Sequence, residues 1–92
     1  MNIEDDCAVI TDMPLSGEVV DFIEQRLRKG LSGADLEEWC DDNLDDLADI
    51  YGKYLTLNFS YIHAEMTLMF LQSVYDRDDV LDIVGSFVDN LI

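Results

Sequence analysis

The fold is decided by residues 35–49, which read DLEEWCDDNLDDLAD. Wound at about 100° per residue, this stretch places its apolar side chains on one side of a helix and its acids on the other. The apolar side consists of Leu36, Trp39, Cys40, Leu44, Leu47, Ile50 and Tyr51. Apart from Ala48, the other side is all carboxylate, made of Asp35, Glu37, Glu38, Asp41, Asp42, Asp45, Asp46 and Asp49. We therefore predict an amphipathic helix with an anionic outward face.

The signals around this stretch predict where it and the preceding helix begin and end. Ser32, followed three residues later by an acid, opens the acidic helix, and Gly52 ends it. Before it, a first helix is predicted over 18–29, with Ser16 as its cap and Gly30 as its stop. Because the linker at Gly30 is very short, we expect these two helices to pack as a hairpin.

The third segment is open to two interpretations. Apolar and polar residues alternate over Leu55–Tyr61, which is a strand pattern. From Phe59 to Tyr75, however, the composition favours a helix, and its apolar residues point all round the wheel. We expect a helix buried on most sides, with Met66 and Met69 as core residues, over a strand followed by a shorter helix.

The whole pattern predicts a mainly α fold, a small single-domain bundle of about four helices spanning 1–92. A last helix is expected to be capped by Asp76 or Asp78 and to carry its apolar face over residues 80–91. The third helix would be central. Residues 1–15 are expected to be a mobile or extended lead-in, in which Cys7–Ile10 could be a short strand.

Composition limits the classes of partner. The 92 residues include 5 basic and 21 acidic ones, a net charge of −16, and 49% are hydrophobic, which favours a folded chain. Direct binding to nucleic acid or to an anionic membrane is disfavoured, because both attract Lys and Arg. Residues 54–75 contain too many polar groups for a membrane span. The absence of a basic start and apolar run at the first residues, and of a CxxC pattern for Cys7 and Cys40, predicts a reduced cytoplasmic protein.

Metal and catalytic sites are poorly supported by the sequence. Asp41, Asn43, Asp45 and Asp49 match four ligand positions of an EF-hand loop, but Asp46 replaces its required glycine and Gly52 its last glutamate. One histidine and two isolated cysteines make no recognisable zinc set. We interpret His63 as a core or helix-end residue, since no nucleophile motif surrounds any Ser or Cys. The sequence thus predicts no enzyme, no catalytic residue, no metal and no cofactor.

Two residues break the helical patterns. Asn43 falls inside the apolar side of the acidic helix, and Arg26 falls in the apolar stripe of the first helix. The ordinary interpretation is a satisfied buried amide and an arginine whose head bridges to an acid. A pairing of these two residues across the hairpin is the alternative. Trp39 and the tyrosines 51, 54 and 61 are expected to belong to the core.

The carboxylates of the acidic helix can be compared with a row of phosphates. Acids at i, i+3 and i+4 lie about 5–6 Å apart on a helix, close to the roughly 6–7 Å between phosphates that we infer for a nucleic-acid strand from its axial rise and sideways travel. One row contains Glu38, Asp42, Asp45 and Asp49. Glu37 and Asp41 form a second row. The alternative is a solvated face that only keeps the protein soluble, although eight acids without interspersed lysines exceed what solubility needs.

In its size, its charge and these acidic rows, the chain resembles the phage-encoded DNA-mimic inhibitors, which include anti-restriction and anti-CRISPR proteins. The resemblance is one of character and not of a sequence motif. It implies a basic nucleic-acid-binding partner, such as a Cas effector or a restriction enzyme, whose DNA groove the acidic helix would fill. The partner-binding residues would be Glu37, Glu38, Asp41, Asp42, Asp45, Asp46 and Asp49, with Asp78, Asp79 and Asp82 second if the last helix lies alongside.

Other function classes share this character. Immunity proteins that neutralise basic nuclease toxins are also small, acidic and often helical, and the sequence does not separate them from DNA mimics. Acyl carrier proteins need an Asp-Ser-Leu before their second helix, which occurs nowhere in this chain. The protein could be a monomer or a homodimer. The apolar third segment could form a dimer interface, although a dimer would bring two charges of −16 together.

Overall fold

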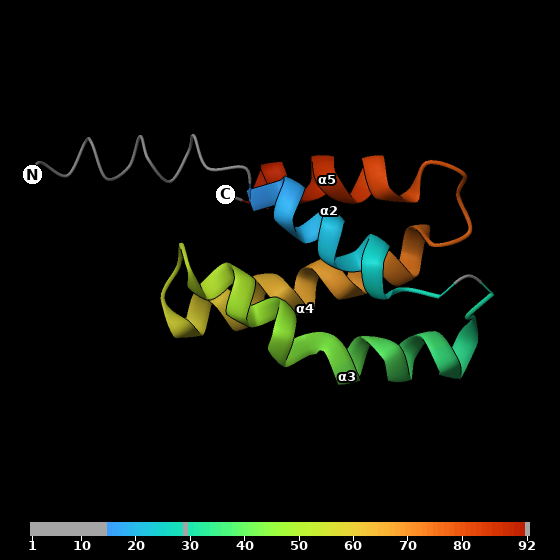
Figure 1. The fold of residues 1–92 in the computed structure, drawn as a ribbon, viewed down its shortest axis with the longest axis horizontal. Coiled ribbons are helices and arrows are strands. Elements are labelled where there is room, and N and C mark those ends of the chain that lie inside the picture. The colour runs from blue at the N-terminus through green and yellow to red at the C-terminus, as the bar shows by residue number, and fades with distance from the viewer. Residues whose placement is uncertain (1–14, 29, 92) are drawn as a thin grey trace, which may run out of the picture.

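The computed structural model describes residues 15–28 and 30–91, which form four α-helices. Helix α2 spans Leu15–Arg26, α3 spans Gly33–Gly52, α4 spans Leu57–Val74 and α5 spans Val80–Leu91. Consecutive helices run in opposite directions (Figure 1). Each helix packs on its chain neighbours, and α5 closes the ring on α2, whereas neither α2 and α4 nor α3 and α5 touch across the diagonal. The protein is therefore a mainly α, up-and-down four-helix bundle.

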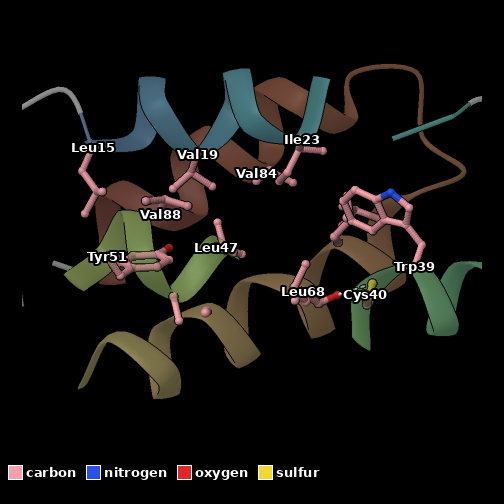
Figure 2. Close-up of a cluster of buried hydrophobic side chains, with 14 of the residues drawn as sticks. Leu15, Val19, Ile23, Trp39, Cys40, Leu47, Tyr51, Leu68, Val84 and Val88 are labelled. Atoms are coloured by element: carbon pink, nitrogen blue, oxygen red, sulfur yellow. Dashed lines mark hydrogen bonds between the residues drawn. The ribbon is translucent and has the colours of Figure 1, made fainter. Parts of the chain in front are cut away.

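The core lies inside this ring of helices and is mostly apolar. Figure 2 shows Val19 and Ile23 of α2 directed toward Val84 of α5, with Leu47 and Tyr51 of α3 across from them. All five of these side chains have no exposed surface. Burying a side chain of this size contributes about 1.5–3 kcal/mol to folding. This burial sets the rotation of each helix, and thereby decides which side chains face solvent.

Three details fix the spacing and connection of the helices. A Cβ atom on Gly85 would lie only 3.3 Å from Val20 Cγ2, so α2 and α5 approach closely because residue 85 has no side chain. Between α2 and α3, Gly30 adopts a φ of +90°, a conformation that favours glycine. The Tyr75 hydroxyl donates a hydrogen bond of 3.0 Å to the carbonyl of Arg28 and ties the end of α4 to this connection.

The acidic helix was predicted most accurately. Ser32 does precede α3 and Gly52 does end it, although the Ser32 side chain makes no capping hydrogen bond. The first helix begins earlier than expected, at Leu15, because that side chain is buried in the core; Ser16 therefore lies inside the helix and does not cap it. Helices α2 and α3 do pack on each other, as predicted for a hairpin. However, α2 packs mainly on α5, and α3 packs mainly on α4.

The third segment, for which the sequence left a strand and a helix open, is a helix. The strand alternative over Leu55–Tyr61 is wrong, since α4 begins at Leu57, and no described residue is in a strand. The last helix starts directly after Asp79, whose carbonyl accepts a hydrogen bond of 3.0 Å from the Ile83 N–H, so neither Asp76 nor Asp78 occupies the capping position. The short strand considered at Cys7–Ile10 lies outside the described residues.

The prediction that the third helix is central and buried on most sides is wrong. Helix α4 packs on α3 and α5 only and leaves one side uncovered. Met66 and Met69, expected in the core, are 43% and 69% exposed. The buried side instead carries small residues in its first half and larger apolar ones in its second half: Ser60, Ala64, Thr67, Leu68, Leu71 and Val74. Small side chains let the backbones of neighbouring helices approach closely.

Candidate protein-binding surface

Helix α3 holds all eight carboxylates of its sequence stretch on the exposed side. The inward side is fixed by six buried residues, Leu36, Trp39, Cys40, Leu47, Ala48 and Tyr51. Every acid between the first and last of these is solvent-exposed. We call this surface the acidic face and define it by Asp35, Glu37, Glu38, Asp41, Asp42, Asp45, Asp46 and Asp49. Ala48 was placed on this side by the helical wheel, but it is only 3% exposed and belongs to the core.

Two polar contacts of buried residues help to hold the rotation of α3. The Trp39 Nε1 proton is donated over 3.2 Å to the carbonyl of Arg26, one of the last carbonyls of α2 and without a partner in its own helix. The Cys40 thiol lies 3.9 Å from the carbonyl of Leu68 on α4. Burial raises the pKa of this thiol, which keeps it neutral near pH 7. These contacts anchor α3 to both of its neighbours and keep the acids turned outward.

In residues 15–28 and 30–91, the acidic face has one ion pair. Arg26 Nη1 lies 3.0 Å from Asp46 Oδ2, and both side chains are about half exposed, at 50% and 52%. The guanidinium also lies over the ring of Phe22, 4.6 Å from its centroid. An exposed pair of this kind contributes about 0–1 kcal/mol. The arginine thus does bridge to an acid, and most of the negative charge of the face is not compensated by a neighbouring cation.

The alternative pairing of Asn43 with Arg26 is not made. Asn43 is half-buried, and its Nδ2 donates a hydrogen bond of 2.8 Å to the carbonyl of Trp39 one turn earlier. Its amide is thereby satisfied within α3. On the side toward α4, the Tyr61 hydroxyl donates a hydrogen bond of 3.0 Å to Asp45 Oδ1. This hydrogen bond and the negative charge of Asp45 raise the pKa of the Tyr61 phenol.

A shallow groove runs beside the acidic face at the start of α3. It has a volume of about 450 Å³ and is lined by three carboxylates and a single guanidinium. The carboxylates belong to Asp35, Glu38 and Asp42, and the guanidinium belongs to Arg28. Trp39 also lines the groove. A groove of this composition is suited to a basic side chain that reaches over the helix.

The second group of candidate residues does not extend the acidic face. Asp78, Asp79 and Asp82 are exposed, but they lie before and at the start of α5. Helix α5 packs on α2 and α4 and makes no contact with α3, so the condition that it lie alongside the acidic helix is not met. Figure 1 shows α5 and α3 on opposite sides of the bundle. Any partner contact at these three aspartates would belong to a different side of the protein.

Both ring nitrogens of His63 lie close to backbone carbonyls, and in the neutral ring one of the two donates a hydrogen bond. Nδ1 lies 2.8 Å from the carbonyl oxygen of Phe59, and Nε2 lies 3.1 Å from that of Leu91. The ring also rests against Tyr51, with centroids 5.7 Å apart. Through these contacts, His63 connects α4 to the end of α5. Among the described residues, no group of three or more His, Cys, Asp or Glu is arranged to hold a metal ion.

One exposed surface was missed by the sequence interpretation. Four large apolar residues of α4 point to solvent, and we call them the apolar stripe: Phe59, Ile62, Met66 and Met69. Their spacing of three, four and three residues is the signal that could have revealed a single apolar line on the helix. The signal was hidden because further apolar residues of α4 point to its other sides.

Comparison with known proteins adds no further assignment. No helix in the described part of the chain is both long enough and apolar enough to cross a membrane. No protein-family model matches the chain, and no curated protein or solved structure is significantly similar to it.

Proposed function

We propose that the protein is a DNA-mimic inhibitor that occupies the nucleic-acid-binding groove of a host defence nuclease complex, either a Cas effector or a restriction enzyme. The observation that carries the proposal is the acidic face itself: eight exposed carboxylates on one helix, of which only Asp46 has a basic partner among the described residues. Their regular spacing of about 5–6 Å between neighbours suits cationic side chains placed to contact successive phosphates.

The mechanism is steric and electrostatic. A groove built from Lys and Arg for DNA gains the same charge contacts from the acidic face and releases its own counterions on binding. The bundle then excludes DNA by its volume. Because the acids sit on a packed helix and not on a loop, little ordering entropy is lost on binding. Attraction between opposite charges also makes association fast and sensitive to salt.

The test compares two variants with equal loss of charge. The first changes four acids of the acidic face: Asp41→Asn, Asp42→Asn, Asp45→Asn and Asp49→Asn. The control changes four exposed acids elsewhere: Asp21→Asn, Glu24→Gln, Asp76→Asn and Asp89→Asn. Both are assayed for inhibition of DNA binding and cleavage by purified Cas effectors and restriction enzymes, after capture of the target from host lysate at low salt.

We expect the first variant to lose inhibition and the control to keep it. If both variants inhibit as well as the unaltered protein, the acidic face is not the binding surface. If both lose inhibition equally, only the net charge matters and the arrangement of acids on α3 does not. Inhibition of a basic nuclease toxin, with no effect on Cas effectors or restriction enzymes, would favour the immunity-protein alternative.

A further inference from the structure

The apolar stripe of α4 is a continuous line of large side chains on a highly charged protein. Phe59, Ile62, Met66 and Met69 are 56%, 48%, 43% and 69% exposed. Their spacing places them one above the other along the same side of the helix. Such a line normally faces another helix.

The neighbouring helices of the bundle leave the stripe open. Ala64 and Leu68 are buried on the side of α4 that packs on α3. On the other side, Phe70 stacks on Phe87 of α5, with the rings parallel and their centroids 4.0 Å apart. The stripe runs between these two contacts, and no described residue covers it.

The size of the stripe suits a single helix. Taking a large apolar side chain as roughly 200 Å² when fully exposed, the four residues present on the order of 400 Å². This lies within the range of the largest apolar patch on a typical monomer, which is often functional. It is about half of what each partner buries in a stable protein dimer, which is roughly 800 Å².

Acidic residues border the stripe on the side toward α3 and lie beyond Phe70 on the side toward α5. Toward α3, Asp41 and Glu65 line a groove of about 220 Å³ together with Met69. Toward α5, Asp79 and Asp82 line a groove of about 470 Å³ around Phe70, which follows Met69 in the sequence. Among the described residues, neither groove is lined by lysine or arginine. An apolar line with an anionic rim toward α3, and with further carboxylates beyond Phe70, is therefore the charge pattern that an occupant has to match.

This pattern disfavours occupants made of the same chain. A second copy placed antiparallel on the stripe brings Glu65 of each copy toward the other, in addition to the repulsion between two bodies of charge −16. Residues 1–14 of the chain contain four acids and no lysine or arginine. Both would place carboxylates against carboxylates at the rims.

We propose that the apolar stripe binds an amphipathic helix of a partner protein, one with apolar residues at i, i+3, i+4 and i+7 flanked by Lys and Arg. The apolar side chains of that helix would cover the stripe, and its cations would meet the acidic rims. Met66 and Met69 are flexible enough to adapt to partners of different shape. This docking surface shares Asp41 with the acidic face, but the proposal does not depend on the nucleic-acid-mimicking role of that face.

The probe is a synthetic helical peptide with leucines at those four positions and lysines beside them. A second peptide replaces each leucine by glutamine and keeps the charge. A third replaces each lysine by glutamine and keeps the leucines. Binding of the three labelled peptides to the full chain is measured by fluorescence anisotropy, and we expect only the first to bind tightly, because it alone matches both the stripe and its rims.

Two pairs of protein variants locate the site. Met66→Ser with Met69→Ser removes apolar surface, and Asp41→Asn with Glu65→Gln removes the rim charge on the α3 side. The control for charge, Asp21→Asn with Glu24→Gln, removes equal charge from exposed residues of α2, a helix that does not pack on α4. We expect each of the first two pairs to weaken binding by about tenfold or more and the control by less than about threefold. Circular dichroism checks that all variants keep their helical content.

Three results would overturn the proposal. The first is equal binding of the leucine and glutamine peptides, which would mean that charge alone attracts them. The second is a dimer of the unaltered protein by sedimentation that Met66→Ser with Met69→Ser dissociates, since a second copy would then fill the stripe. The third is tighter peptide binding after Val9→Ser with Ile10→Ser, because the stripe would then be covered by the chain's own first residues.

Discussion

The Tyr51 hydroxyl donates a hydrogen bond to Thr67 Oγ1 over a distance of 2.6 Å at the centre of the α3–α4 contact. The direction follows from the next hydrogen bond in the chain, because Thr67 Oγ1 donates its single proton to the carbonyl of His63, 2.8 Å away. Both side chains have no exposed surface. A polar connection between α3 and α4 is thus built into an otherwise apolar core.

The burial of Tyr51 predicts how stability depends on alkaline pH. Burial raises the pKa of this phenol from 10.0 to about 12. The phenol is neutral in both states below pH 10, so its contribution to stability is complete there. Between pH 10 and about 12 the Tyr51 phenol ionises in the unfolded chain but stays neutral in the folded protein. The free energy of unfolding therefore falls by up to about 3 kcal/mol.

The variant Tyr51→Phe isolates this effect. Near neutral pH it should be less stable than the unaltered protein by about 1 kcal/mol, the contribution of one hydrogen bond. Above pH 10 the difference should shrink and then reverse, because phenylalanine does not ionise. Urea unfolding at a series of pH values measures both, and a difference that stays constant through this range would contradict the assignment to Tyr51.

Truncation of Leu47 should be among the more damaging core changes. This side chain has no exposed surface and lies in the centre of the bundle, so Leu47→Ala should cost about 2–5 kcal/mol through lost burial and the cavity left behind. The same change at Leu57, which is 72% exposed, should cost less than about 0.5 kcal/mol. Denaturant unfolding of the two variants provides the comparison, and similar losses would contradict the packing described for α3.

The close approach at Gly85 predicts a coupled pair of substitutions. A methyl group at residue 85 would press on Val20 Cγ2, so Gly85→Leu should destabilise the bundle by about 1–3 kcal/mol through overpacking. Val20→Ala removes Cγ2, the atom that the new side chain at residue 85 would contact. In the double variant part of the loss should therefore be recovered, and strict additivity of the two changes in melting temperature would show that α2 and α5 do not meet at this point.

Self-repulsion predicts an unusual response to salt. With a net charge of −16, the melting temperature should rise between low and physiological salt, as the Debye length shortens to about 8 Å. At low salt, Asp41→Asn should raise the melting temperature further, because Asp41 lies beside Glu65. Asp46→Asn should gain less, since it also removes the ion pair with Arg26. Thermal scans by circular dichroism measure these melting temperatures. A melting temperature that falls as salt is added would contradict strong repulsion.

The sequence predicted α3 well because several signals agreed on it. The apolar period, the Ser32 start and the Gly52 end all belong to the same stretch, and burial follows that period with the exception of Ala48. The acids could be placed outward for the same reason. Helix α4 lacks this agreement, because its apolar residues surround the wheel. In the bundle the polar Ser60 and Thr67 are buried while Met66 and Met69 are exposed, an outcome that residue hydrophobicity does not encode.

The candidate site was only partly predictable for a related reason. The exposure of the acids on α3 follows from one helix alone, whereas the position of Asp78, Asp79 and Asp82 depends on which helices are neighbours. The sequence alone does not show that α5 packs on α2 and not on α3. The apolar stripe depends in the same way on two neighbours of α4, so it becomes visible only in the assembled bundle.

The closure of the ring by α5 on α2 has a kinetic consequence. It is the one helix pair joined across most of the sequence, whereas the other three pairs are connected by short turns. Local pairs lose little chain entropy on forming, so the α3–α4 hairpin should assemble early and the docking of the first described helix against the last should complete folding. We therefore expect the docking of α2 on α5 to limit the rate of folding. These two helices approach each other at Gly85.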